Sequence, residues 1–356
     1  MRALSEAERA AELDGGPLPE GSEVRPGLWV LPQPMPSEHP PRFTLSYLLR
    51  DAEDGLHLID PGLATEANHE RLMALLAGIG STPDALRTIT STHLHSDHLG
   101  LAARLRAETG ARVAVHRLEQ ESIVRLAETG PNRAGLQADR AEGWGVPAER
   151  LAELSAAASS PAAAVSRGSG GASAFQADVL LENGEILDVP GRRIRVLQTP
   201  GHTPGSICLI DEDSRAVFTG DHLLPTMFPG IGLGGPTPDA IGDYLASLDA
   251  LETAGEELGD IDTVEVLPGH GYRFTGLADR VATTRRHHAA RAAEVAAIVE
   301  AHPHATVWEV ASRVSWTAGW ENLHGFYLLS ALAQTKMHVV HVAARRGAGA
   351  TEIQGS

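Results

Sequence analysis

Residues 91–100 read STHLHSDHLG and place three histidines and one aspartate within six residues. The stretch follows LRTIT at 86–90, a run of β-forming residues, so it lies where a strand passes into a loop. Residues two apart on a strand share a side, which lets His93 and His95 face one ion. Asp97 and His98 lie past the turn and can reach a second position beside the first. Imidazole and carboxylate groups suit Zn²⁺, Fe²⁺ or Mn²⁺, so a metal site is predicted here.

Three later segments each place one potential ligand directly after a strand-like run. His202 lies in QTPGHTPGS at 198–206, Asp221 in AVFTGDHLL at 216–224, and His270 in EVLPGHG at 265–271. Layered sheets bring such strand ends to one edge, so distant parts of the chain can contribute to one site. The predicted metal ligands are His93, His95, Asp97, His98, His202, Asp221 and His270.

Short β-forming runs alternate with single helical stretches, which indicates a mixed α/β fold. LWVLP at 28–32, FTLSYLLR at 43–50 and LHLIDPG at 56–62 predict strands, and HERLMALLAGIG at 69–80 predicts a helix ending at glycine. The predicted organisation begins with a lead-in and a catalytic domain, which an insertion of helix and Gly/Ser-rich loop interrupts. The insertion would form a lid, with a disordered surface loop at 156–174 as the alternative. A helical or winged-helix module follows. The predicted ranges are 1–24 for the lead-in, 25–276 for the catalytic domain, 117–180 for the insertion and 277–356 for the module.

The H-x-H-x-D-H motif, together with TPGHTPGS, TGD and PGHG, resembles the metallo-β-lactamase superfamily over roughly residues 25–275. This resemblance implies an αββα four-layer sandwich with two metal ions at one rim of its sheets. It implies that Asp221 bridges the two ions, and that Asp60 in IDPG supports the site without ligating. The alternative for Asp60 is that it only caps the turn that follows. The implied ligands are His93, His95 and His202 for the first ion, and Asp97, His98 and His270 for the second.

The resemblance also implies chemistry, which is hydrolysis by a hydroxide bridging two divalent ions. Zinc is the default ion, and iron and manganese fit the same ligands. Asp97 would hold the attacking water in line. His222 is a candidate acid for the leaving group, with a core or loop histidine as the alternative. The chain is similar to the glyoxalase-II-like hydrolases with a C-terminal module, so the expected substrate is a small-molecule thioester, ester or lactone.

The composition also bears on the alternative functions of such a metal site. The 356 residues carry a formal net charge of −17, which disfavours a nucleic-acid substrate. A phosphodiesterase or endoribonuclease using the same metals would need a basic track, for which the candidates are Arg280, Arg285, Arg286 and Arg291. A binding module with purely structural metals is the remaining alternative.

The sequence also bears on location and assembly. The single cysteine, the charged N-terminus and the lack of a run of about 18–20 apolar residues predict a cytoplasmic protein without membrane association. A homodimer through the C-terminal helices is a further expectation.

Overall fold

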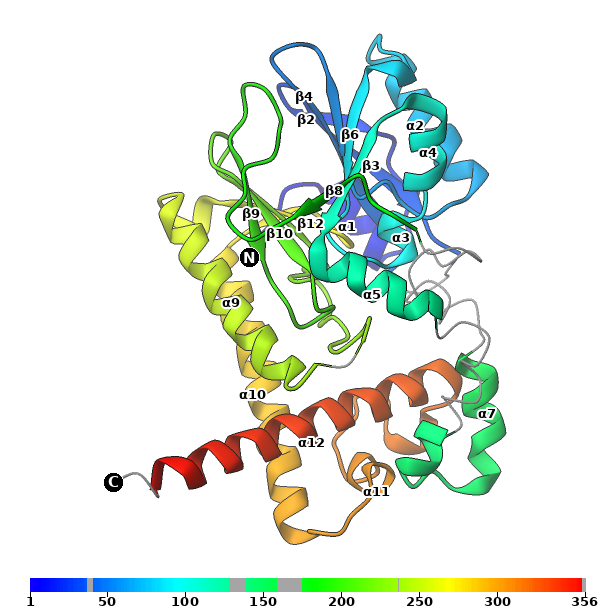
Figure 1. Ribbon diagram of the computed structural model, residues 1–356, viewed down its shortest axis with the longest axis vertical. Coiled ribbons are helices and arrows are strands. Elements are labelled where there is room, and N and C mark those ends of the chain that lie inside the picture. Colours follow the sequence, from blue (N-terminus) through cyan, green and yellow to red (C-terminus); the bar gives the residue numbers. More distant parts are fainter. Residues whose placement is uncertain (37–40, 129–138, 159–174, 236, 354–356) are drawn as a thin grey trace.

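In the computed structural model, two β-sheets pack face to face and helices cover their outer faces (Figure 1). The structure describes residues 1–36, 41–128, 139–158, 175–235 and 237–353. The first sheet contains, in spatial order, β2 (Ser22–Arg25), β3 (Leu28–Pro34), β4 (Phe43–Arg50), β5 (Leu56–Ile59), β6 (Leu86–Thr90), β7 (Arg112–His116) and β8 (Val179–Leu181). The second contains β1 (Arg2–Ala3), β13 (Phe274–Thr275), β12 (Glu265–Pro268), β11 (Ala216–Gly220), β10 (Ile207–Asp211) and β9 (Ile194–Gln198).

Strand direction brings several chain segments out at one rim. In the first sheet β5, β6, β7 and β8 run parallel, and Ile59 pairs with Thr90 at the ends of β5 and β6. In the second sheet β11 and β12 run parallel, with Gly220 opposite Pro268. The carboxyl ends of parallel strands meet at the same edge, so the loops after these strands leave the two sheets close together.

The apolar residues form three layers, as the alternation along the strands requires. Between the sheets, Val30, Tyr47 and Phe218 belong to one buried cluster. On the outer face of the first sheet, the strands pack against α2 (Glu66–Gly78) and α4 (Ala102–Thr109). On the outer face of the second sheet, they pack against α9 (Ala240–Glu257) and the first turns of α10 (Leu277–Ala301). The predicted αββα sandwich is therefore confirmed.

A separate helical layer lies beside the sandwich (Figure 1). It combines the end of α10 with α11 (Val307–Ala311) and the long α12 (Gly325–Ile353). Helix α7 (Ala148–Ala158), from the predicted insertion, contributes Leu154 to the same apolar cluster as Leu328 and Leu332 of α12. Most of the predicted Gly/Ser-rich loop at 156–174 lies outside the described residues. The described elements after Thr275 are all helices, so no wing strand is found within residues 277–353.

The remaining helices are short or lie near the rim: α1 (Glu6–Leu13), α3 (Ser96–Leu99) and α5 (Arg117–Glu128). None of the helices in the described ranges combines the length and apolar character that crossing a membrane requires.

The crossing of α10 and α12 buries several histidines. His288 and His338 stack with their ring centroids 5.9 Å apart, and neither ring nitrogen of His288 has a hydrogen-bond partner among the described residues. Burial, together with nearby histidines and Arg291, lowers the pKa of His288 to about 3 and that of His338 to about 4. The unfolded chain therefore binds more protons than the folded chain below about pH 6.5, and these residues cost stability as the pH falls.

His288→Phe removes the titrating imidazole and is therefore expected to weaken this acid sensitivity. A phenyl ring suits the position, because Tyr244 and Phe228 already contact the ring there. The free energy of unfolding of the metal-free variant, measured by urea at pH 7 and at pH 5, should fall less between the two pH values than that of the unchanged protein. The exposed His304, replaced by glutamine, is the control and should not alter the difference. An unchanged pH dependence in His288→Phe would contradict the account of this cluster.

Candidate metal centre

The seven predicted ligands meet at the rim where the parallel strands end. His93 and His95 lie between β6 and α3, and Asp97 and His98 lie within α3. The other three follow β9, β11 and β12. Their ligand atoms form two groups, each within 4.8 Å, made of His93, His95, His202 and Asp221 in one and Asp97, His98 and His270 in the other.

Besides Asp221, the first group contains three imidazoles whose ring nitrogens point at one another. His95 Nδ1 lies 3.0 Å from His93 Nε2 and 3.1 Å from His202 Nε2. Burial lowers the pKa of all three rings, that of His95 to about 3, so they are neutral at pH 7. Three neutral nitrogens directed at one point offer three lone pairs, which is how proteins bind Zn²⁺.

The second group adds a carboxylate to two imidazoles. His98 Nε2 lies 3.2 Å from His270 Nε2, and Asp97 Oδ2 lies 3.1 Å from His270 Nε2. Burial lowers the pKa of His98, but Asp221, Asp97 and Asp60 outweigh it and raise the pKa to about 10. The carboxylates therefore favour a positive charge at this group, either on His98 or on a bound cation.

Asp221 lies between the groups. Its Oδ1 is 3.3 Å from His98 Nε2 and 3.5 Å from His270 Nε2, whereas its Oδ2 is 3.7 Å from His202 Nε2. One oxygen thus faces each group, so the carboxylate could bridge two ions. A Cβ at Gly269 would lie 2.6 Å from His98 Cε1 and 2.7 Å from Asp221 Oδ1, so only glycine leaves the groups room. The residues present therefore fit two divalent cations.

Hydrogen bonds from outside the groups orient three of the imidazoles. Asp60 Oδ2 accepts from His98 Nδ1 at 2.9 Å, and the carbonyls of Gly230 and Phe43 accept from Nδ1 of His202 and His270. Each donated Nδ1–H fixes the tautomer and leaves Nε2 free to ligate. Asp60 also accepts from the backbone N–H and hydroxyl of Thr92, which ties it to the loop before His93.

Asp60→Ala is expected to lower metal affinity about 10–100-fold, because His98 loses the acceptor that fixes its tautomer. The control is Asp51→Ala, since Asp51 Oδ2 contacts His57 Nε2 at 2.9 Å in the same way, near the start of β5 and outside both groups. Zinc affinity by chelator competition should fall only in the Asp60 variant. Equal affinities in both variants would show that Asp60 does not support the site.

The structure does not bring His222 into either group. Its ring is buried against Tyr244, with ring centroids 4.8 Å apart, and burial lowers its pKa to about 3. These contacts are those of a core histidine, the alternative interpretation. Its role as an acid for the leaving group stays a prediction that no contact here supports.

The loop after Asp221 is held by helices of the C-terminal region, which the sequence did not indicate. Arg280 of α10 donates to the carbonyls of Leu224 and Met227, and Gln334 of α12 exchanges two hydrogen bonds with the backbone of Ile231. Ile231 adjoins the glycine whose carbonyl orients His202. Arg280, one of the four arginines considered for a basic track, is therefore buried and bound to backbone carbonyls.

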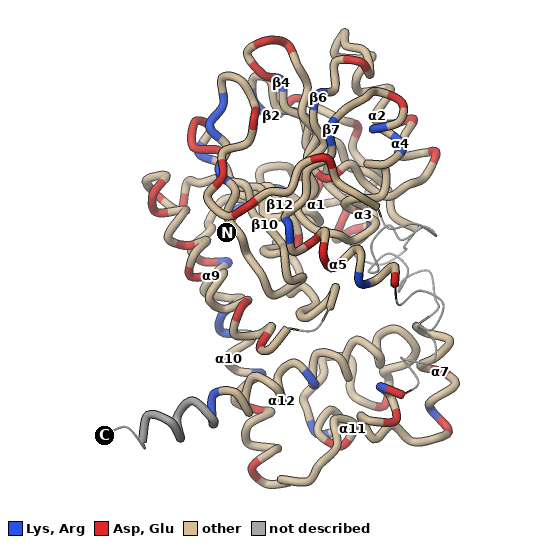
Figure 2. The backbone as a smooth tube through the Cα atoms, viewed as in Figure 1, with Lys and Arg blue, Asp and Glu red and all other residues tan. Residues whose placement is uncertain are grey.

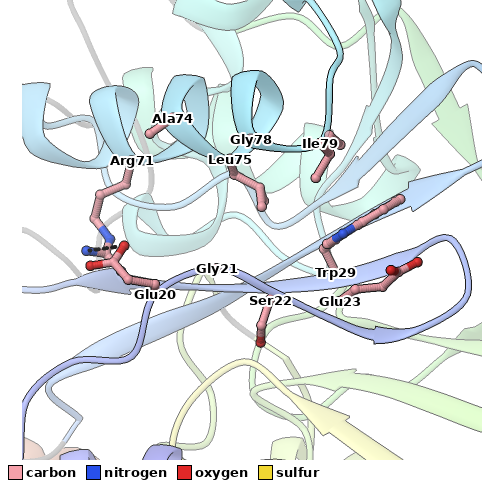
Figure 3. Close-up of a pocket in the computed structure, with 10 residues that line it drawn as sticks. All are labelled: Glu20, Gly21, Ser22, Glu23, Trp29, Arg71, Ala74, Leu75, Gly78 and Ile79. Carbon is pink, nitrogen blue, oxygen red and sulfur yellow. Dashed lines mark ion pairs between the residues drawn. The ribbon is translucent and has the colours of Figure 1, made fainter.

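A separate pocket of about 260 Å³ lies between the turn before β2 and helix α2 (Figure 3). None of the predicted ligands lines it, so it is not part of this centre. Its lining residues are Glu20, Gly21, Ser22, Glu23, Trp29, Arg71, Ala74, Leu75, Gly78 and Ile79.

A two-sheet sandwich with histidines and aspartates gathered at its rim defines a metal-dependent hydrolase. The chain belongs to the metallo-beta-lactamase superfamily, whose family model matches residues 39–270. Both the class of enzyme and the family agree with the expectation from the sequence.

Two curated relatives are similar over somewhat less than two thirds of the chain. The acyl-coenzyme A thioesterase MBLAC2 of Homo sapiens is 29% identical over 64% of this chain and 73% of its own length. The hydroxyacylglutathione hydrolase GloC of Haemophilus influenzae is 28% identical over 63% of this chain and 84% of its own length. Among solved structures, the metallo-beta-lactamase family protein TTHA1429 from Thermus thermophilus matches with a TM-score of 0.71 and 26% identity, covering 91% of this chain and 95% of that one. This likeness extends beyond residues 39–270 into the helical layer.

Proposed function

We propose that this protein hydrolyses the thioester bond of a small acyl-carrying molecule at a centre of two divalent cations, with zinc as the default ion. The observation that carries the proposal is Asp221, whose two oxygens face the two ligand groups. The names of the two curated relatives, a thioesterase and a hydroxyacylglutathione hydrolase, favour a thioester among ester-type bonds.

Two such ions, when bound, lower the pKa of water toward neutrality and polarise the carbonyl under attack. The side chains supply the rest. Asp97 Oδ2 lies at the second group and would accept a proton from the attacking water while ligating. Cys208 cannot replace water as the nucleophile, because it is buried in β10 and burial raises its pKa to about 12.

The charge distribution supports a small substrate over nucleic acid. Two of the arginines considered for a basic track are already paired: Arg285 with Asp249 and Glu252, and Arg291 with Glu294. Acidic residues of α9 lie beside basic residues of α10 (Figure 2). With a net charge of −17, the protein offers little attraction to phosphate backbones.

A parallel assay tests the proposal. Metal-loaded protein is given an acyl-coenzyme A, an acylglutathione, a homoserine lactone, bis(p-nitrophenyl) phosphate and a short RNA. At least one thioester should turn over faster than the lactone and both phosphodiesters, and a chelator should stop the reaction. Preferential cleavage of RNA or the phosphodiester would contradict the thioester assignment, and turnover that survives chelation would contradict the metal centre.

A further inference from the structure

Glu119, in the first turn of α5, is fully buried and accepts three hydrogen bonds from two separate loops. Its Oε2 accepts from the N–H of Leu94 at 2.7 Å. Its Oε1 accepts from the hydroxyl of Thr203 at 2.7 Å and from the N–H of Gly205 at 2.6 Å. One carboxylate therefore connects the loop after β6 to the loop before β10.

These two loops carry the whole imidazole set of the first ligand group. Leu94 lies between His93 and His95 in sequence, and Thr203 directly follows His202. The distances among the three ring nitrogens depend on how these loops sit relative to each other. Glu119 is bonded to both loops at residues adjacent to the ligands, so it helps to hold that relation, beside the backbone hydrogen bond from the N–H of Ile207 to the carbonyl of Thr92.

Packing leaves the second loop little freedom to sit elsewhere. A Cβ at Gly205 would lie 2.5 Å from the backbone nitrogen of Glu119 and 2.9 Å from the carbonyl carbon of Leu118. The loop thus rests on the first turn of α5 at a distance that only glycine permits. This contact presents the Gly205 N–H to the carboxylate.

The charge of Glu119 is also informative. Within the described part of the chain it forms no ion pair, and its three donors are neutral groups. Burial raises its pKa to about 7 although the hydrogen bonds oppose the shift. A buried carboxylate costs free energy unless positive charge lies nearby. In the described part of the chain, the three hydrogen bonds from neutral donors offset part of this cost.

We propose that Glu119 is a positioning residue for the first metal ion, holding the His93–His95 loop and the His202 loop at ligating distance. This inference rests on the proposed two-metal function. Removal of the carboxylate should weaken the first site by the 10–100-fold typical of groups that orient ligands, and should leave the second site largely unaffected.

The test measures zinc affinity of the full chain by competition with a chromophoric chelator, in two backgrounds. Asp97→Ala leaves only the first group intact, and His202→Ala leaves only the second. Glu119→Gln keeps the shape of the side chain but turns one acceptor into a donor. It should lower zinc affinity about 10–100-fold in the first background and less than about twofold in the second.

A milder pair of variants guards against misfolding. Thr203→Val removes one donor and should weaken the first site, whereas Thr203→Ser keeps the hydroxyl and should restore it. Asp211→Asn, at a buried carboxylate at the far end of β10, should leave zinc affinity unchanged. Equal affinities with and without Glu119, or equal losses in both backgrounds, would overturn the assignment. If the unchanged protein binds no zinc, the metal centre itself fails, which distinguishes the two results.

Discussion

Asp221→Ala is expected to lower kcat/KM for a thioester by about 1,000-fold or more. Asp221 presents one oxygen to each ligand group, so its loss removes the ligand that both ions would share. Metal ions contribute several kcal/mol of transition-state stabilisation, and each 1.36 kcal/mol corresponds to a factor of ten in rate. Steady-state kinetics combined with elemental analysis measure the activity and the metal content together.

The control for this variant is Asp211→Ala, which removes a buried aspartate from the other end of the same sheet. Asp211 Oδ1 accepts from the N–H of Ser214, and Oδ2 pairs with Arg192, so its loss affects stability and not the rim. The control should keep two metal equivalents and the kcat of the unchanged protein. An Asp221→Ala variant that retains both ions and at least a tenth of the activity would contradict the bridging role.

Asp97→Ala is expected to abolish measurable hydrolysis and to weaken the second ion's site while the fold stays intact. Asp97 supplies the only carboxylate of its group apart from the bridge, and it would hold the attacking water. Positioned proton acceptors alone contribute about 100–10,000-fold to rates, and the weakened second site adds to that loss, so no hydrolysis should be measurable.

The metal content separates this variant from Asp221→Ala. Purified Asp97→Ala should hold about one equivalent of metal, retained by the three imidazoles of the first group, with an unchanged circular dichroism spectrum. Full activity in this variant would refute the assigned role. A loss of both ions would show that the two groups are not separate sites.

The clustering of these seven side chains at one rim was predictable because its signals are local. His93, His95, Asp97 and His98 lie within six residues, and each later ligand follows a recognisable strand. The contact between Asp60 and His98 was also predictable, because Asp60 directly follows β5, and β5 pairs with β6, the strand that leads into the H-x-H-x-D-H motif. Such patterns depend on strand periodicity and turn chemistry, both of which are written in neighbouring residues.

Other features depend on contacts between distant segments, which no local pattern encodes. Glu119 lies in LEQES, an ordinary helical start, and its partners Thr203 and Gly205 are 84 and 86 residues away. His288 follows Arg285, Arg286 and His287, a run typical of a solvated helix face, yet α12 covers it. Helix α7 was predicted only as part of an insertion, whereas in the structure its apolar face packs against α12 in the helical layer.

Seven side chains from distant strands are proposed to hold two cations at one rim. Anomalous diffraction, recorded at the absorption edge of the metal found by elemental analysis, would locate these cations. Crystals of the purified, active protein should show two peaks about 3.5–4 Å apart, one against each ligand group, with Asp221 between them. Active crystals that show no peak, or a single peak away from Asp221, would contradict the claim.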